Sequence, residues 1–346
     1  MKAVYFTEHG GPEVLKFGEL PEPTPGEGEV KIKVKACALN RLDVYTRAGV
    51  RGTKMNLAEP HVLGADVSGE VVEIGPKVTR VSAGDRIVVN PRITCMQCRY
   101  CQSNQTEYCG SAGMIGSAIR GGYAEYVVVP ATNAFPIPDA LTHVQAASLP
   151  TVFMPSWNIL IRRSQLKPWE TALVPSASSG VGTAAIQVAK NIAKSTVIAT
   201  TSTAGKAEKA AALGSDHVIN YKLEDVSERL KEITQGRGVD VVIDHVGTDI
   251  WNAANRRLAT GARYGICGVT SGYKAELQMG AMFTRHLTMF GVFMGRSEDL
   301  EQIIYHAGQG TIKGVVDSEY PLQDVRKAHE DMEGLDFFGK LVITVD

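Results

Sequence analysis

Apolar runs alternate with helical patterns through the second half of the chain. Runs at residues 171–175, 196–201, 216–221, 239–246, 263–268 and 287–294 predict strands. Between two of these runs, residues 204–213 have helical spacing, and Gly214 suits a C-terminal helix stop. Strands that alternate with helices form a parallel sheet, and ligands bind at the carboxyl ends of its strands. The pattern therefore predicts an α/β domain with a binding site at that edge.

The first part of the chain, up to about Thr151, has a different texture. Residues 30–36 alternate between apolar and polar, residues 69–74 and 86–89 are rich in β-branched side chains, and Gly and Pro mark the turns. This favours a separate β-rich domain. After Met294, helical patterns at 300–306 and 325–332 and strand-like pieces at 312–320 and 340–345 fit either domain.

One turn in the α/β part has the chemistry of a phosphate site. The segment from Glu170 to Lys190 runs from an apolar strand through small residues into a helix, with Gly180 and Gly182 at the helix start. Unbonded amides and the helix dipole at such a start suit a pyrophosphate. The spacing is A-x-x-G-x-G rather than G-x-G-x-x-G, because Ala177 stands at the first glycine position, and tight packing alone is the alternative interpretation. The predicted dinucleotide contacts are Ser178, Ser179, Gly180 and Val181.

The end of the second strand of this domain bears on the choice of dinucleotide. An acidic residue there would bond the ribose 2′-hydroxyl and repel a 2′-phosphate. The sequence has no acidic residue between Ser195 and Ala207, whereas Thr201 and Ser202 offer hydroxyls and Lys206 a positive charge. The pattern favours NADP(H). The alternative is a solvated helix start with a surface lysine.

Composition narrows the possible partners. The 346 residues leave room for two domains, and 44% hydrophobic and 21% charged residues are ordinary for a globular protein. A net charge of −1 gives no electrostatic case for binding nucleic acid or an acidic membrane. The N-terminus begins directly with a strand pattern, and no apolar run reaches membrane-spanning length. We therefore expect a cytoplasmic protein.

Four cysteines are clustered in a polar loop, in C-x₂-C-x₂-C-x₇-C spacing. Four thiolates this close suit a tetrahedral zinc ion without an open coordination position, so the metal would be structural. Disulfides are disfavoured in a cytoplasmic chain, and the fourth cysteine is too distant for the ferredoxin-type iron–sulfur run. The predicted ligands of one structural Zn²⁺ are Cys95, Cys98, Cys101 and Cys109.

Together these features resemble the medium-chain dehydrogenase/reductase superfamily. The resemblance covers essentially the whole chain, including the opening MKAVYFTEHGGPEVL, the cysteine lobe, the AxxGVG turn and the closing PLQDVRKAHEDMEG with FGKLV. It implies a GroES-like catalytic domain with an inserted Rossmann domain. The expected boundaries are 1–151 with a zinc lobe at 91–110, 152–295 for the NADP(H)-binding domain, and 296–346 completing the catalytic domain.

Alcohol dehydrogenases of this superfamily hold a second, catalytic zinc with Cys, His and Cys, and this sequence departs from that set. Asn40 stands at the first position, Ala65 replaces the His and leaves Asp66 for the Glu of the motif, and Thr151 falls near the third position. None of the three replacements is a good zinc ligand. We therefore expect no catalytic zinc.

Without that zinc, an alkoxide loses its stabilising partner, and a target that spreads the charge of an incoming hydride becomes more favourable. The resemblance places Asn40, Asp43, Tyr45 and Thr151 in cleft-lining segments. We expect Tyr45 to donate to the developing oxyanion or to relay a proton, and Asn40 and Thr151 to orient the substrate or nicotinamide. The alternative for Asp43 and Tyr45 is a helix cap and a packing residue.

The resemblance also extends the cofactor site. Lys206 and Tyr221 match the residues that bracket the adenosine 2′-phosphate in quinone oxidoreductases. Four further residues lie at carboxyl ends of later strands, where the family's main chain meets the ribose and carboxamide; core packing is their alternative role. They are Val246, Gly268, Val269 and Phe293. Lys340, near the C-terminus, reaches either the cofactor or solvent, and it is not part of the predicted site.

The predicted function is an NADPH-dependent oxidoreductase that transfers hydride to a quinone or to the C=C of an α,β-unsaturated carbonyl or enoyl thioester. The alternatives are an alcohol dehydrogenase acting on alcohols or aldehydes and a non-catalytic NADPH-binding protein. The expected partner is a small electrophilic substrate, with no nucleic acid and no membrane. By family analogy we expect a homodimer or homotetramer.

Overall fold

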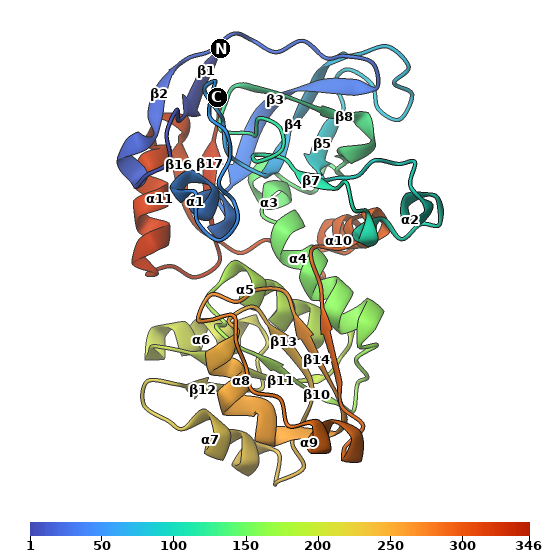
Figure 1. Cartoon of the computed structure of the whole chain (residues 1–346), viewed down its shortest axis with the longest axis vertical. Coiled ribbons are helices and arrows are strands. Elements are labelled where there is room, and N and C mark those ends of the chain that lie inside the picture. Colours follow the sequence, from blue (N-terminus) through green and yellow to red (C-terminus); the bar gives the residue numbers. More distant parts are fainter. The chain divides into compact units, whose positions relative to one another are not determined.

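The computed structural model describes all 346 residues, which divide into two compact units. One unit comprises residues 1–151 together with 296–346, and the other comprises residues 152–295 (Figure 1). None of the helices combines the length and the hydrophobicity that crossing a membrane requires.

The unit formed by the two ends of the chain is built on a seven-stranded sheet with the order β16-β17-β3-β4-β5-β9, in which β8 also pairs with β3. The alternation predicted at residues 30–36 belongs to β3, whose inward side chains, among them Val30, Ile32 and Val34, are fully buried. The two chain ends meet in this sheet because β17 pairs antiparallel with β3. Residues 296–346, whose pattern fitted either domain, therefore belong to this β-rich unit.

The strands of this unit are β1 (Lys2–Tyr5), β2 (Lys16–Glu19), β3 (Glu29–Ala38), β4 (Asp66–Ile74), β5 (Arg86–Val89), β6 (Arg92–Ile93), β7 (Gly113–Met114), β8 (Tyr126–Pro130), β9 (Ala134–Pro136), β16 (Val316–Pro321) and β17 (Lys340–Thr344). Its helices are α1 (Arg41–Ala48), α2 (Arg99–Gln102), α3 (His143–Ala147), α10 (Ser297–Gly308) and α11 (Val325–Gly334).

Residues 152–295, which lie in sequence between the two segments of the first unit, form what we call the inner unit. It holds a six-stranded, wholly parallel sheet with the order β12-β11-β10-β13-β14-β15. Counted from β10, this is the 3-2-1-4-5-6 order of a Rossmann sheet, so its ligand site is expected at the carboxyl edge beside β10. Its strands are β10 (Thr171–Val174), β11 (Thr196–Thr201), β12 (His217–Asn220), β13 (Val239–Asp244), β14 (Leu258–Ile266) and β15 (Thr288–Gly291). Its helices are α5 (Gly180–Gln187), α6 (Ala204–Leu213), α7 (Val226–Ile233), α8 (Thr248–Ala254) and α9 (Met279–Thr284), and α4 (Pro150–Trp157) leads into it.

Two strands in this sheet have a boundary that differs from the predicted one by three residues or more. The strand expected at 263–268 begins at Leu258, because Gly261 adopts a left-handed φ of 80° in an irregular stretch that breaks the apolar alternation. The strand expected at 287–294 ends at Gly291, and Met294 has a left-handed φ of 65° that no regular strand contains. Both errors come from backbone conformations that hydrophobicity does not encode.

Candidate active site

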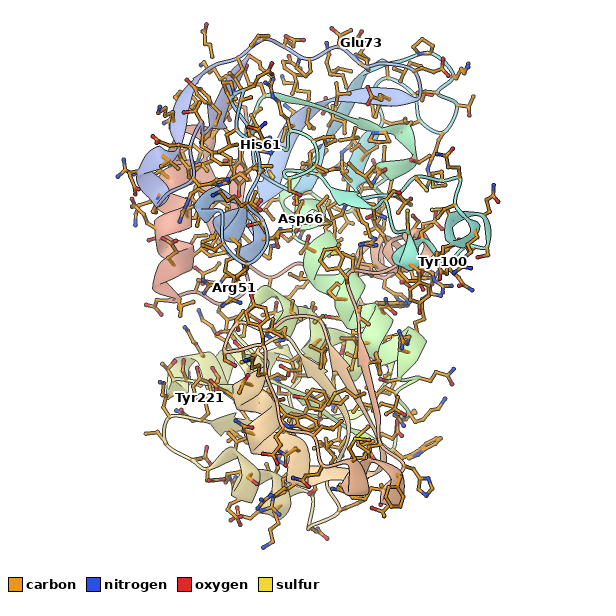
Figure 2. The ribbon with its side chains drawn as sticks, viewed as in Figure 1. Arg51, His61, Asp66, Glu73, Tyr100 and Tyr221 are labelled. Carbon is orange, nitrogen blue, oxygen red and sulfur yellow. The ribbon has the colours of Figure 1, made fainter.

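Asp66 is the centre of a buried polar network in the β-rich unit (Figure 2). Its Oδ1 accepts hydrogen bonds from the Thr151 hydroxyl at 2.6 Å and the Thr151 amide at 3.1 Å. Its Oδ2 accepts from Asn40 Nδ2 at 2.9 Å and from Lys340 Nζ at 3.2 Å. A buried carboxylate needs such donors to offset its lost hydration. We refer to Asn40, Asp66, Thr151 and Lys340 as the Asp66 network.

The strand register creates this network. In β3 and β4, Ala38 pairs with Asp66, and in β3 and β17, Ala38 pairs with Val342. Because antiparallel partners run in opposite directions, two further residues bring Asn40 opposite Lys340. The Lys340 ammonium donates to Asn40 Oδ1 at 2.6 Å, and Asn40 Nδ2 also donates to the Ala38 carbonyl at 3.3 Å. The orientation of the Asn40 amide is therefore fixed.

Lys340 is the residue that the sequence interpretation missed. The solvent-facing alternative for it is wrong, because only 3% of Lys340 is exposed and its ammonium lies between Asn40 and Asp66. A lysine near the C-terminus normally suggests a solvated side chain. Two features of the sequence could have indicated a buried lysine. Lys340 begins an apolar strand, and Asp66, in a motif that normally holds a metal ligand, needs a positively charged partner.

Asp43 lies in the first turn of α1 and holds the backbone next to the Asp66 network in place. One carboxylate oxygen accepts from the Asn40 amide at 2.8 Å, as in a helix cap, and the other accepts from the Gly64 amide at 3.0 Å. Burial raises the pKa of Asp43 to about 7, against the opposite effect of these two amide bonds. The helix-cap interpretation of Asp43 thus describes its contacts, and a direct role in chemistry stays a prediction.

Tyr45 lies on α1 but has other partners. The guanidinium of Arg51 stacks over its ring with 4.6 Å to the ring centroid, and the Thr53 hydroxyl donates to the Tyr45 carbonyl at 2.7 Å. The structure brings Asn40 and Thr151 together around Asp66 and gives Tyr45 no hydrogen bond to them. Its predicted role as a proton donor stays a prediction.

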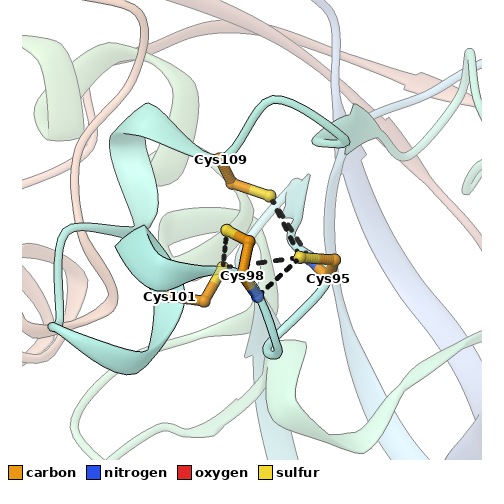
Figure 3. A group of neighbouring side chains, drawn as sticks. All are labelled: Cys95, Cys98, Cys101 and Cys109. Carbon is orange, nitrogen blue, oxygen red and sulfur yellow. Dashed lines mark hydrogen bonds between the residues drawn. The ribbon is translucent and has the colours of Figure 1, made fainter.

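The four predicted cysteine ligands converge on one point (Figure 3). Their sulfur atoms all lie within 4.8 Å of one another, with Cys95–Cys101, Cys98–Cys101 and Cys95–Cys109 separations of 3.9, 3.6 and 3.5 Å. Four sulfurs at about 2.3 Å from a tetrahedral zinc would be about 3.8 Å apart, so the cluster fits that ion. The Gln97 and Cys98 amides lower the pKa of Cys95 to about 6, which favours the thiolate form that a metal binds.

The small-residue turn of the inner unit begins a helix as predicted. Ser179 is the N-cap of α5, and its hydroxyl oxygen accepts from the Gly182 amide at 2.9 Å. The amides of Gly180 and Val181, the first two helical residues, have no partner within the helix. Gly182 is required, because an added Cβ would lie 2.3 Å from the Ser176 carbonyl oxygen. The turn thus offers amides and a helix dipole to an anion.

The residues predicted to surround a 2′-phosphate lie at the ends of β11 and β12. Thr201 pairs with Asn220, and the Tyr221 amide donates to the Thr201 carbonyl at 3.0 Å, so Tyr221 stands beside the end of β11 (Figure 2). Thr203 caps α6, and its hydroxyl accepts from the Lys206 amide at 3.3 Å. Thr201 Oγ1 is buried without a hydrogen-bond partner. The strand register therefore gathers Thr201, Ser202 and Tyr221 at this corner, with Lys206 in the first turn of α6.

The remaining predicted cofactor residues follow neighbouring strands. Val246 comes two residues after β13, and its amide donates to Asp244 Oδ1 at 2.7 Å. Gly268 and Val269 follow β14, where a Cβ on Gly268 would lie 2.8 Å from the His245 carbonyl oxygen. Phe293 follows β15 and is 57% exposed, which argues against a packing role for that side chain. All four residues lie after carboxyl ends of strands, and their contacts with a cofactor stay predictions.

The sequence matches known proteins along nearly its whole length. Residues 26–139 match the alcohol dehydrogenase GroES-like domain, and residues 180–307 match the zinc-binding dehydrogenase domain. Quinone oxidoreductase 1 of Escherichia coli is 32% identical, with 95% of both chains covered. The chain belongs to the medium-chain dehydrogenase/reductase superfamily. An NAD-dependent alcohol dehydrogenase of Saccharolobus solfataricus is 30% identical over 99% of both chains.

A solved structure of an NAD-dependent alcohol dehydrogenase matches the fold with a TM-score of 0.95, 38% identity and complete coverage of both chains. The family resemblance and the predicted fold class, a GroES-like domain plus a Rossmann domain, are thus confirmed. The relatives support an oxidoreductase that acts on a small molecule. The zinc-binding family match and the cysteine cluster support a structural zinc and a nicotinamide cofactor.

Proposed function

We propose that this member of the superfamily is an NADPH-dependent reductase that works without a catalytic metal. Its targets are quinones and the C=C bond of α,β-unsaturated carbonyl compounds or enoyl thioesters. The observation that carries the proposal is the Asp66 network. Where related alcohol dehydrogenases are expected to bind zinc, an ammonium group is hydrogen-bonded to Asp66 and Asn40.

The residues of this corner do not fit a divalent cation. Ala65 has no ligand atom, and both oxygens of Asp66 already accept two hydrogen bonds each. A divalent ion at Asp66 would also face the charge of Lys340, and like charges at short range repel strongly in a buried site. The chain has no other described group of three or more His, Cys, Asp or Glu side chains that fits a metal besides the cysteine cluster.

Chemistry without a metal suits a conjugated target. A bound reduced nicotinamide would supply hydride, two electrons and a proton, to the β-carbon of such a target as its C=C π bond breaks. The charge then rests on oxygen as an enolate, which ordinary hydrogen-bond donors stabilise, and a solvent-derived proton completes the product. Tyr45 is our proposed donor to that oxygen. The donors of Asn40 and Thr151 are used within the Asp66 network, so these residues act by positioning the corner.

The preference for NADPH rests on the corner at β11 and β12. It combines hydroxyl groups, a lysine and an exposed tyrosine without a carboxylate between residues 195 and 207. In Lys206→Ala, we expect the dissociation constant for NADPH to rise about tenfold and that for NADH to change little, as for loss of one phosphate contact. Equal effects on both cofactors would contradict the assignment.

A substrate panel tests the proposal as a whole. Purified protein is assayed with NADPH and NADH against quinones, enals, enones and enoyl thioesters, and in the reverse direction with alcohols and NADP⁺ or NAD⁺, while zinc is counted by mass spectrometry. We expect activity on the conjugated targets, one zinc per chain, and loss of that zinc in Cys101→Ser. Two zinc ions per chain with chelator-sensitive alcohol oxidation would overturn it.

Alcohol oxidation is the second candidate function. The names of two relatives favour it, because both are described as NAD-dependent alcohol dehydrogenases. In the same panel, turnover of simple alcohols with NAD⁺ that exceeds turnover of every conjugated carbonyl would support this candidate. Cofactor binding without turnover of any substrate would instead support a non-catalytic NADPH-binding protein.

A further inference from the structure

His245 lies at the carboxyl end of β13 and is 9% exposed. Its backbone is held firmly: Asp244 Oδ1 accepts from the Val246 and Gly247 amides, and Asp244 Oδ2 accepts from the Tyr264 hydroxyl at 2.7 Å. Gly268 packs against the His245 main chain, as an added Cβ would lie 2.8 Å from its carbonyl oxygen. The imidazole therefore projects from a rigid strand end.

The imidazole reaches the small-residue turn. β13 pairs with β10, and the turn that follows β10 ends at Ser179. His245 Nε2 lies 2.8 Å from Ser179 Oγ. The same hydroxyl oxygen already accepts from the Gly182 amide, so Ser179 Oγ joins the helix cap to the next strand.

The proton positions follow from the second ring nitrogen. His245 Nδ1 is buried without a partner. If Ser179 donated to Nε2, then Nδ1 would carry an unpaired buried N–H, which is rarer in proteins than an under-satisfied acceptor. If Nε2–H donates instead, Nδ1 keeps only an unpaired lone pair. Burial also lowers the pKa of His245 to about 4, so the ring is neutral at pH 7.

With Nε2–H as donor, Ser179 Oγ accepts two hydrogen bonds, one from Gly182 and one from His245. The hydroxyl proton then has no acceptor in the protein and is available to a ligand, beside the unbonded amides of Gly180 and Val181. A cap serine on its own uses its oxygen for the helix and leaves its proton free to rotate. The imidazole removes that freedom.

We propose that His245 is a positioning residue that directs the Ser179 hydroxyl proton to an oxygen of the dinucleotide pyrophosphate. This rests on the proposed dinucleotide site at the same turn. His245 does not touch the cofactor, and it acts through the orientation of Ser179. Cofactor binding thus depends on the end of β13, where His245 lies 66 residues after Ser179 in the sequence.

Two polar substitutions test the proposal. Gln at position 245 retains an N–H donor at the distance of Nε2, whereas Asn is too short. We expect the dissociation constant for NADPH, measured by nicotinamide fluorescence, to rise about tenfold in His245→Asn and to stay within about threefold of wild type in His245→Gln. Ser179→Ala should weaken binding as much as His245→Asn, and the double variant should be no weaker than Ser179→Ala alone.

His143→Asn is the control for a histidine-to-asparagine change outside the turn, where His143 Nδ1 lies 2.9 Å from Ser68 Oγ. Its dissociation constant for NADPH should equal that of wild type. Equal effects of Asn and Gln at position 245, or additive effects of the His245 and Ser179 changes, would overturn the role of His245. If wild type binds neither NADPH nor NADH, the proposed function itself fails. If His245→Asn does not fold, Ser179→Ala and His245→Gln still test the proposal. A dissociation constant for NADPH that is the same in Ser179→Ala as in wild type would contradict it.

Discussion

The Asp66 network and the phosphate turn are both polar, yet they differ in how completely they are satisfied. Asp66 has four donors, and Asn40 and Lys340 bond to each other as well as to Asp66. At the turn and the neighbouring strand end, by contrast, the Gly180 and Val181 amides have no partner within their helix, and Thr201 Oγ1 has no hydrogen-bond partner.

The difference separates two functions that a polar cluster can have. A network whose members satisfy one another is already organised and gains little from an added ion or ligand. A cluster with unpaired groups is stabilised when a ligand supplies the missing partners, since buried polar groups are costly to leave unbonded. We infer that the Asp66 network is structural and that the phosphate turn is the cluster prepared to bind an anionic ligand.

The largest expected effect comes from breaking the satisfied cluster. Lys340→Met leaves the carboxylate of Asp66 buried without its counter-charge, so we expect the free energy of unfolding to fall by about 3–5 kcal/mol. Urea denaturation followed by circular dichroism measures this change. The double variant Lys340→Met with Asp66→Asn should recover part of the loss, because it removes both charges.

Lys327→Met provides the control for that experiment. Lys327 pairs with Asp331 one turn along α11, and its side chain is 63% exposed, so its loss should leave the unfolding free energy almost unchanged. A Lys340→Met protein no less stable than Lys327→Met would mean that Asp66 does not need its ammonium partner. The metal-free account of this corner would then lose its main support.

A smaller effect is expected at the phosphate turn. In Gly182→Ala, the new Cβ meets the Ser176 carbonyl oxygen at 2.3 Å and the Ala177 Cα at 2.8 Å, so the backbone of the turn must shift. We expect a loss of about 1–3 kcal/mol in unfolding free energy and at least tenfold weaker NADPH binding. Gly280→Ala in α9 is the control, because open space surrounds that position and alanine favours a helix. Unchanged NADPH binding by Gly182→Ala would contradict a role for this turn.

The sequence predicted the architecture well, because hydrophobic periodicity and glycine spacing are local signals. The parallel strands, the helix that begins at Gly180 and the cluster of four cysteines can all be predicted from short segments. Strand order and register decide what lies across the sheet, and these are tertiary properties. For this reason the structure, and not the pattern, brings Lys340 to Asp66.

The same limit applies to His245. As a single residue at the end of a buried strand it has no motif, and its importance depends on β13 lying next to β10. Asn40 and Thr151 are predicted to orient the substrate or nicotinamide because their segments resemble cleft-lining parts of the family. The structure shows that both side chains donate to Asp66 and that Asn40 also accepts from Lys340, and their roles toward a ligand stay predictions. Departures from the family pattern thus predict which positions form the site, whereas the role of each replacement depends on the side-chain contacts that it makes.

The smallest expected effect concerns acid and compares one buried histidine from each unit. Burial and the nearby Arg47 charge lower the pKa of His329 to about 3, and burial lowers that of His245 to about 4. Both side chains therefore bind fewer protons when folded than when unfolded, so their contribution to stability is lost as pH falls below about 6.5. Burial raises the pKa of Asp43 to about 7, and this shift stabilises the folded protein as pH falls, so the pH dependence of wild-type stability alone does not isolate the histidines.

The informative quantity is the unfolding free energy of a variant minus that of wild type, measured at each pH. Between pH 7 and pH 5.5 it should rise by about 1 kcal/mol in His329→Gln and by a similar amount in His245→Gln. Parallel curves for wild type and His329→Gln would mean that folding does not lower the pKa of this imidazole. Similar slopes for both variants, together with weaker NADPH binding in His245→Asn and unchanged binding in His329→Gln, would show that the two regions share their response to acid and differ in their role toward a ligand.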